Sequence, residues 1–236
     1  MHESLDVEDQ ELRLLYKALA AEYDLTETLY AFGGHSFSFL SVLDSYALLD
    51  RISPEEFVKD EQMPYWAEIW PSAITLSSFI AEELPLKGFR VIEIGAGVGM
   101  ASTVAAWKGA SVLATDYSLE ALRFVKYNAL KNKVSFDIER LDWRLVKCSE
   151  QFDILFAADV LYERVNLLPI VTAIDKLLKP DGAAYLADPR RRMAEQFLEL
   201  AAENNFSITP FPRKYTGGSK DVAVNIYKMT RQKNTP

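Results

Sequence analysis

The sequence predicts an α/β fold built on a doubly wound, mostly parallel sheet of seven strands in which the last strand runs antiparallel. Short apolar segments alternate with helix-forming segments from residue 72 onward, which is typical of a parallel sheet covered on both faces. A glycine-rich turn follows the first of these strands. The two final strands are joined by too few residues for a crossover, so they should pair antiparallel.

The elements of this body can be assigned in order along the chain. Helices are expected where strong helix formers carry apolar side chains at helical spacing, and strands where short apolar runs end at turn residues. The predicted strands are 89–95, 110–116, 134–142, 152–162, 182–189, 206–212 and 221–229, and the predicted helices are 72–84, 100–109, 119–132, 166–180 and 191–205.

Residues 1–63 are predicted to form an extension ahead of a domain that spans 64–236. Residues 8–22 contain strong helix formers, with Leu12, Leu15, Tyr16 and Leu19 at helical spacing, and predict a helix. Ser53-Pro54-Glu55-Glu56 has the residues of a helix start, because Ser favours the N-cap and Pro the first helical position.

A β-hairpin is expected between these two helices. Two β-prone segments, 25–32 and 35–43, flank the pair Gly33-Gly34, which suits a tight two-residue turn. His35 follows that turn and is expected to be a partly exposed strand residue. The extension is therefore predicted to contain a helix and a hairpin.

Composition narrows the possible functions. The chain has 236 residues, 26 Lys and Arg against 34 Asp and Glu, and a net charge of −8, which argues against binding nucleic acid through its overall field. One cysteine and two histidines exclude an internal disulfide and make a thiolate or histidine metal site improbable. No apolar run is long enough to span a membrane, and the acidic start is unlike a targeting peptide, so a cytoplasmic protein without a metal is expected.

The turn after the first body strand reads Glu93-Ile94-Gly95-Ala96-Gly97-Val98-Gly99-Met100. Glycines at this place let the backbone turn tightly and approach a ligand at a helix N-terminus. The spacing differs from the dinucleotide fingerprint, which would place its third glycine at position 100. No phosphate-binding Lys-Ser/Thr pair follows.

This E-x-G-x-G-x-G pattern resembles the nucleotide-binding loop of the seven-strand, Rossmann-like S-adenosylmethionine methyltransferases. Asp116 stands at the end of the second strand, where an acid can accept hydrogen bonds from both ribose hydroxyls; the alternative is an acid at a helix N-terminus. In the resembled family an acid at the place of Asp142 contacts the adenine amino group and its neighbour packs on the ring, against the alternative of a strand-terminal acid. The resemblance implies cofactor contacts from Trp70, Glu93, Gly95, Ala96, Gly97, Gly99, Asp116, Tyr117, Asp142, Trp143 and Asp159.

Two further segments narrow the resemblance. Residues 64–71 read P-Y-W-x-x-x-W-P, and Asp159-Val160-Leu161-Tyr162 follows the fourth strand. Together they look like the seven-strand protein-lysine methyltransferases, above all the lysine methyltransferase of the electron-transfer flavoprotein β subunit and its bacterial nicotinamide-methyltransferase-like relatives. Ala187-Asp188-Pro189-Arg190 fits that branch loosely. The resemblance covers about residues 64–230.

The resemblance implies methyl transfer from S-adenosylmethionine to a lysine of a protein substrate, with Asp159 and Tyr162 as catalytic residues. Asp159 would orient the incoming ammonium or the methionine end of the cofactor, and Tyr162 would line the lysine channel. The structural alternative places Asp159 at a helix N-cap and Tyr162 in the core.

Two other functions stay open. A small-amine methyltransferase would close an aromatic pocket around Tyr65, Trp66, Phe37 and Phe39, and a non-catalytic module would retain the nucleotide fold alone. The run Arg190-Arg191-Arg192 is expected at a solvated helix start or as an anchor for acidic partners.

Overall fold

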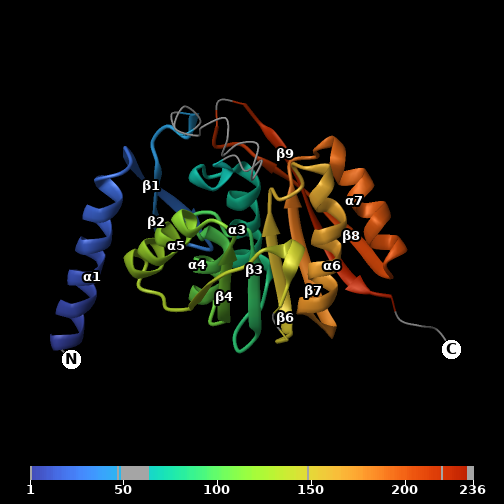
Figure 1. Cartoon of the computed structure of the whole chain (residues 1–236), viewed down its shortest axis with the longest axis horizontal. Coiled ribbons are helices and arrows are strands. Elements are labelled where there is room, and N and C mark those ends of the chain that lie inside the picture. Colours follow the sequence, from blue (N-terminus) through green and yellow to red (C-terminus); the bar gives the residue numbers. More distant parts are fainter. Residues whose placement is uncertain (1, 47, 49–63, 148, 219, 233–236) are drawn as a thin grey trace.

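The structure is a computed structural model of the chain, and it describes residues 2–46, 48, 64–147, 149–218 and 220–232 (Figure 1). The predicted helix start at 53–56, Cys148 and the predicted domain boundary at residue 63 lie outside the described residues. The division of the chain into 1–63 and 64–236 therefore stays a prediction. In the described part, no helix combines the length and apolar character that crossing a membrane requires.

Seven strands form one sheet in the order β5-β4-β3-β6-β7-β9-β8. Pairing is parallel from β5 through β7, whereas β9 pairs antiparallel with both of its neighbours, which confirms the predicted fold class. The strands are β3 (Arg90–Ile94), β4 (Ser111–Asp116), β5 (Asp137–Arg140), β6 (Phe152–Ala158), β7 (Leu178–Asp188), β8 (Phe206–Tyr215) and β9 (Val222–Arg231).

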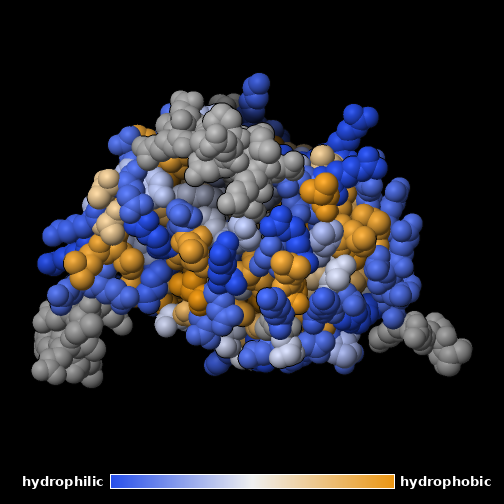
Figure 2. Space-filling view, viewed as in Figure 1, coloured by the Kyte–Doolittle hydropathy of each residue, from blue (hydrophilic) through white to orange (hydrophobic). Residues whose placement is uncertain are grey.

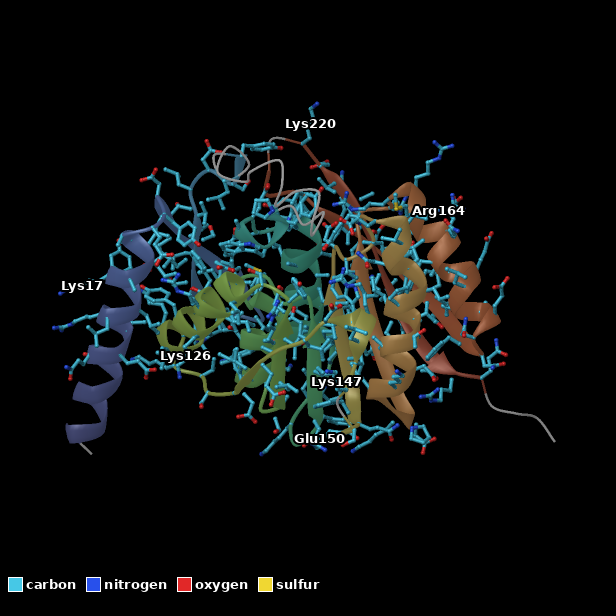
Figure 3. All side chains as sticks on the ribbon, in the orientation of Figure 1. Lys17, Lys126, Lys147, Glu150, Arg164 and Lys220 are labelled. Atoms are coloured by element: carbon cyan, nitrogen blue, oxygen red, sulfur yellow. The ribbon has the colours of Figure 1, made fainter. Side chains whose placement is uncertain are left out.

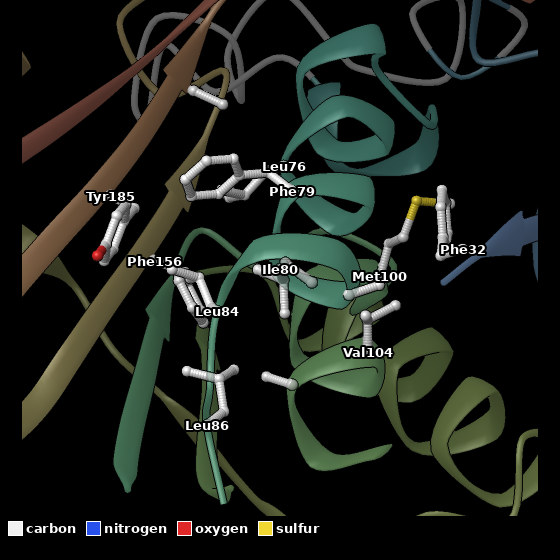
Figure 4. Close-up of a cluster of buried hydrophobic side chains, with 14 of the residues drawn as sticks. Phe32, Leu76, Phe79, Ile80, Leu84, Leu86, Met100, Val104, Phe156 and Tyr185 are labelled. Atoms are coloured by element: carbon white, nitrogen blue, oxygen red, sulfur yellow. The ribbon is translucent and has the colours of Figure 1, made fainter. Parts of the chain in front are cut away.

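Helices cover both faces of this sheet. On one face α3 and α4 pack against side chains such as Val91 and Phe156, and α5 packs against Ala114 of β4. On the other face α6 and α7 pack against side chains such as Ile92 and Leu155. Figure 4 shows the first of these clusters, where Phe79 and Ile80 of α3 meet Phe156. The helices are α3 (Pro71–Glu83), α4 (Met100–Trp107), α5 (Leu119–Lys131), α6 (Leu167–Leu177) and α7 (Arg192–Glu203).

Two element ends differ from the sequence prediction for local reasons. Strand β6 ends at Ala158, four residues before the predicted end, because Asp159 adopts a left-handed backbone with φ 59° that an extended strand does not allow. Helix α6 ends at Leu177 and β7 begins at Leu178. Pro180 follows, and a proline disfavours helical geometry in the residue before it.

The predicted helix and hairpin at the N-terminus are confirmed. Helix α1 (His2–Ala20) packs on α5 beside the hairpin of β1 (Leu25–Phe32) and β2 (His35–Val42), at the end of the sheet away from α7 (Figure 1). The turn residues Gly33 and Gly34 have φ 55° and 78°, as a type I′ turn requires. His35 is exposed on one side and stacks on Trp107 with ring centroids 5.1 Å apart.

One buried side chain ties the hairpin to the sheet domain. Asn128 of α5 accepts a hydrogen bond from the Leu40 amide (2.8 Å) and donates to the Leu40 carbonyl (3.0 Å). It also donates to the carbonyl of Val98 in the glycine-rich turn (2.9 Å). Because an unpaired buried amide is costly, these bonds fix the hairpin against α5 and the turn together.

Candidate active site

A cleft lies where β3, β4 and β6 end, the edge at which α/β sheets bind ligands. Its walls come from the loops after these strands, from the short helix η2 (Tyr65–Ala67) and from the start of α3. In Figure 3 Arg164 marks this edge of the sheet and Glu150 the opposite one. The predicted site residues that line it are Trp70, Glu93, Gly95, Ala96, Gly97, Asp116, Tyr117, Asp142, Trp143, Asp159 and Tyr162.

The glycine-rich turn brings three loops into one wall. Gly95 and Gly97 have φ 66° and 55°, a conformation that glycine adopts without steric cost. A Cβ at Gly95 would lie 3.0 Å from a methyl of Val160 and 3.1 Å from the ring of Trp143. Glycine at this position therefore lets the loop after β3 pack directly on the loops after β5 and β6.

Gly99, the remaining predicted cofactor residue, does not line the cleft. It precedes α4 with φ 82°, and a Cβ there would lie 3.2 Å from the Val125 Cα. In this structure Gly99 allows α4 to pack closely on α5, and a direct contact with a cofactor stays a prediction.

Asp116 closes the end of β4 over the glycine-rich turn. Its carboxylate accepts hydrogen bonds from the amides of Gly97 (2.9 Å) and Ser118 (2.9 Å). Burial raises the pKa of Asp116 to about 6, against the lowering effect of these amide donors. Asp116 therefore bonds to the start of α5, as the alternative of a helix-start acid expects. It also bonds to the glycine-rich turn, which that alternative does not include.

Glu93 lies beneath the turn, with its side chain buried. Its carboxylate accepts hydrogen bonds from the Ser102 amide (2.8 Å) and the Ser102 hydroxyl. Burial raises the pKa of Glu93 to about 8, since it outweighs the two Ser102 bonds, and the charge of Asp116 raises it further. A nearby cation would favour the ionised carboxylate, so this side of the cleft suits a positively charged ligand.

Asp142 begins the short helix η3 (Trp143–Leu145) and is partly buried. Although burial acts in the opposite direction, hydrogen bonds from the Arg144 side chain and amide hold its pKa below the usual value. The Arg144 guanidinium lies 2.8 Å from the carboxylate and 5.3 Å from the ring centre of Tyr117. Asp142, Arg144 and Tyr117 therefore form one connected edge of the cleft.

Asp159 follows β6 and faces a different environment. Its buried carboxylate pairs with Arg191, whose Nε and terminal nitrogen lie 2.8 and 2.6 Å from Oδ1. The other oxygen, Oδ2, is buried and has no hydrogen-bond partner among the described residues. Asp159 does not cap the following short helix, whose N-cap residue is Glu163, so the predicted N-cap alternative is wrong.

An aromatic wall faces Asp159. The rings of Tyr162 and Tyr65 lie 4.7 Å apart, and the Trp70 indole N–H donates to the Tyr65 carbonyl (2.8 Å). Burial raises the pKa of Tyr162, helped by the nearby Glu163 carboxylate, so its hydroxyl stays protonated. Tyr162 lines the cleft rather than the core.

The aromatic pocket expected for a small amine is only half present. Tyr65 and Trp66 line the cleft, but Phe37 and Phe39 are fully buried in the core beside α3. The hairpin turns these two rings toward the sheet domain because alternate side chains of β2 face it. The expectation that Phe37 and Phe39 close a pocket is therefore wrong.

Acidic side chains dominate the lining of the cleft. Within the described part of the chain six of them line it, while Arg144 is the one cationic side chain that does so. Glu93, with its pKa of about 8, adds its negative charge when a cation lies nearby. Arg144 is already paired with Asp142. The cleft therefore favours cationic ligands over anionic ones. The carboxylates belong to Glu68, Glu93, Asp116, Asp142, Asp159 and Glu163.

Comparison with known proteins places the chain. The family model described as "Lysine methyltransferase" matches residues 57–204, which is more than half of the sequence. The chain belongs to this family. A seven-strand S-adenosylmethionine methyltransferase of the protein-lysine group is thus confirmed as its class, with S-adenosylmethionine as the family's methyl donor.

Individual relatives of this lysine methyltransferase agree with that assignment. It is 36% identical to the protein-lysine methyltransferase METTL21E of Mus musculus over 62% of this chain and 67% of that protein. It is 26% identical to EEF1A lysine methyltransferase 3 of Xenopus tropicalis over 71% and 76%. The match to a Homo sapiens sequence named as a methyltransferase-like protein 21E pseudogene spans 60% of that sequence.

Solved structures support the fold. A ribosomal protein L11 methylase from Lactobacillus delbrueckii is 25% identical over 68% of this chain and 79% of its own, with a TM-score of 0.54. Neither METTL21E nor EEF1A lysine methyltransferase 3 is named for the electron-transfer flavoprotein. The comparisons therefore support the lysine methyltransferase group, and the finer branch that the motifs indicated stays a prediction.

Sequence reasoning missed several residues that complete the site of this lysine methyltransferase. Arg144 and Ser118 are chain neighbours of predicted residues, and Glu68 lies inside the Trp-rich motif. Arg191, expected at a solvated or partner-facing helix start, pairs with Asp159 from 32 positions away. The available signal was the order of the strands, because β6 and β7 are neighbours and their following loops must meet.

Proposed function

We propose that this chain transfers a methyl group from S-adenosylmethionine to the ε-amine of a lysine in a partner protein. The observation that carries the proposal is the cleft of six carboxylates and aromatic rings, found in a chain of the lysine methyltransferase family. Both the methyl donor and a lysine are cations, and carboxylates in a partly closed cleft attract cations.

The residues present fit the cofactor. S-adenosylmethionine, when bound, supplies a methyl group on a positively charged sulfur. Gly95 and Gly97 line the cleft without a side chain of their own, and Asp116 would accept the ribose hydroxyls. Glu93 would hold the amino-acid end, and Trp143 with Asp142 would border the adenine.

The remaining residues serve the acceptor amine. A free lysine has a pKa of about 10.4, so it must lose a proton to solvent before it can act as a nucleophile. Partial burial between Tyr162, Tyr65 and Trp70 disfavours its charged form. Asp159 would orient the amine toward the donor, which is mainly a positioning task.

The surroundings of the cleft support a protein substrate over a free amine. Leu145, Val165 and Leu168 are 67%, 72% and 51% exposed and lie on η3, η4 (Arg164–Asn166) and the start of α6, elements that contact one another. Figure 2 shows apolar side chains interrupting the hydrophilic surface where α6 lies. An apolar rim next to a binding site is typical of a protein-docking surface.

The first test is methyl transfer from radiolabelled S-adenosylmethionine into a cell extract, resolved on a denaturing gel. We expect a discrete labelled protein that disappears with Asp159→Ala and persists with Asp137→Ala, an exposed acid at the start of β5. Label only in the small-molecule fraction would replace this proposal with a small-amine methyltransferase. Cofactor binding without any transfer would indicate a non-catalytic module.

The substrate itself can be approached through the resemblances. The motifs indicate the electron-transfer flavoprotein β subunit, and the name of one relative indicates EEF1A. We therefore propose these two proteins as the first purified substrates, with mass spectrometry to locate the modified lysine. Leu145→Ser with Val165→Ser should raise KM for the protein, while Leu29→Ser, equally exposed on the hairpin, should not.

A further inference from the structure

The loops after β6 and β7 share a buried cluster of charges. Asp188 is 0% exposed, and its Oδ1 accepts a hydrogen bond from the Arg191 amide (2.6 Å). The Arg191 side chain reaches back to Asp159 Oδ1 (2.8 Å). The Asp159 amide donates to the carbonyl of Ala187 (2.8 Å), so the two loops are bonded through both main chain and side chain.

The cluster is more than a helix cap. A carboxylate that caps α7 would normally lie in contact with water, whereas Asp188 Oδ2 and Asp159 Oδ2 are both buried and unpartnered in the described structure. Both carboxylates thus bond to Arg191, Asp188 to its backbone amide and Asp159 to its guanidinium. Such an arrangement is costly, and strained or unsatisfied groups of this kind concentrate at functional sites.

Arg191 also contacts the aromatic wall. Its guanidinium lies 5.8 Å from the ring centre of Trp70, within the range of a cation–π contact. It does not line the cleft, whereas Asp159 and Trp70 do. Arg191 therefore acts on the cleft through these two residues.

We propose that Arg191 is a positioning residue for Asp159 and that Asp188 in turn fixes Arg191. The inference rests on the proposed function, in which Asp159 orients the acceptor amine. Arg191 holds the left-handed Asp159, with φ 59°, by one carboxylate oxygen. The guanidinium thereby sets which way the carboxylate faces when the amine arrives.

The charged and polar groups around Asp188 come from three parts of the fold. Asp159 follows β6, Arg190 and Arg191 precede α7, and Asn225 on β9 is the register partner of Asp188 and accepts a hydrogen bond from Arg190 (3.3 Å). Burial raises the pKa of Asp188 to about 6, with the charge of Asp159 adding to it and the amide and guanidinium of Arg191 opposing it. Asp188 therefore takes up a proton at mildly acidic pH and loosens its hold on Arg191.

The test compares Arg191→Gln and Arg191→Lys with Arg192→Gln, its neighbour at an exposed position. We expect Arg191→Gln to lower kcat by roughly tenfold or more, with S-adenosylhomocysteine binding close to wild type. The melting temperature should also fall, because the buried Asp159 carboxylate loses its ion-pair partner. Arg191→Lys should recover part of the loss, and Arg192→Gln should behave as wild type. The double variant with Asp159→Asn should be no slower than the slower single variant, because both act at one point. Wild-type kcat in Arg191→Gln, or additive losses, would overturn the proposal.

Asp188→Asn supplies a second readout. The Asn side chain keeps an acceptor for the Arg191 amide but cannot titrate. The fall of kcat on acidification near pH 6 should therefore be smaller than in wild type. The melting temperature of the ligand-free protein should also change less with pH near 6. An unchanged fall of kcat and an unchanged melting profile would contradict the role of Asp188. The melting profile needs no substrate, so it tests the cluster even if wild type methylates no protein and the proposed function fails.

Discussion

The buried carboxylates on the two sides of the cleft differ in their hydrogen-bond partners. On the side that we propose binds the cofactor (the cofactor side), Glu93 and Asp116 receive hydrogen bonds from Ser102, Gly97 and Ser118. On the side that we propose binds the amine (the acceptor side), Asp159 keeps one buried oxygen without a partner in the described structure and depends on Arg191 for the other. The carboxylates of the cofactor side are hydrogen-bonded by protein amides and a hydroxyl, whereas the Asp159 carboxylate is bonded by the Arg191 guanidinium.

This difference in hydrogen bonding fits the ligand that each side is proposed to bind. A cofactor side that is already hydrogen-bonded needs little rearrangement to bind, and preorganisation reduces the cost of association. An acceptor side must admit a lysine side chain from another molecule and allow its ammonium group to lose a proton to solvent. Each of the following experiments perturbs one side and asks whether the other responds.

The largest effect is expected at Gly95. Gly95→Ala places a Cβ 3.0 Å from Val160 and 3.1 Å from Trp143 at positive φ, so the wall of the cofactor side must open. We expect the Kd for S-adenosylhomocysteine to rise at least ~30-fold by calorimetry. Gly88→Ala is the control, because φ is 83° there but nothing lies within 4 Å; equal loss of binding in both would mean that backbone strain alone matters.

Asp116→Asn should have the next largest effect. The two carboxylate oxygens accept from the amides of Gly97 and Ser118. In Asn one of them becomes an NH2 group that cannot accept, so one of these bonds is lost and the predicted ribose acceptor is weakened. The Kd for the cofactor should rise about tenfold or more, while kcat at saturating cofactor changes little. A fall in kcat with unchanged Kd would show that the two sides are not separable.

Tyr162→Phe tests the acceptor side with a smaller change. The ring remains against Tyr65, but the hydroxyl at the cleft is removed. We expect kcat/KM for the protein substrate to fall about 2–10-fold with cofactor binding unaffected. Tyr185→Phe, in the core beside Phe79 and Phe156, is the matched control and should keep wild-type rates.

The smallest effect is a change in how stability depends on pH. The pKa of Glu93 is about 8 in the folded protein against 4.5 as its ordinary value, so the unfolded chain releases its proton first. The contribution of Glu93 to stability is present below pH 4.5 and is lost as pH rises through 8. Between those values the melting temperature of wild type should fall by several degrees relative to Glu93→Gln; parallel curves would contradict the assignment.

The sequence predicted the fold, and it predicted that residues of the glycine-rich turn and the end of β4 line the cleft, because both depend on local patterns. The glycine-rich turn, Glu93 and the strand before it are contiguous, and Asp116 ends the next strand. Helix and strand order then fixes where these residues meet. The hairpin was predictable for the same reason, since Gly33-Gly34 sits between two β-prone segments.

The acceptor side was only partly predictable. Asp159 and Tyr162 were found through a motif, but their surroundings depend on residues far along the chain. Arg191 was not recognised because its run of arginines has the composition of a solvated helix start. Phe37 and Phe39 are buried because their face of β2 packs against the sheet domain. The alternation of residues along β2 does not predict which of its two faces is buried in this way.

Asn128 gives the molecule a thermodynamic link between two distant segments. The same amide holds Leu40 in the hairpin and Val98 in the glycine-rich turn. The docked hairpin stabilises the turn in the conformation that binds a ligand. Because such coupling is reciprocal, a bound ligand stabilises the docked hairpin by the same free energy. Hydrogen exchange at the Leu40 amide should then slow as the cleft fills, so the hairpin reports on a cleft that neither β1 nor β2 lines.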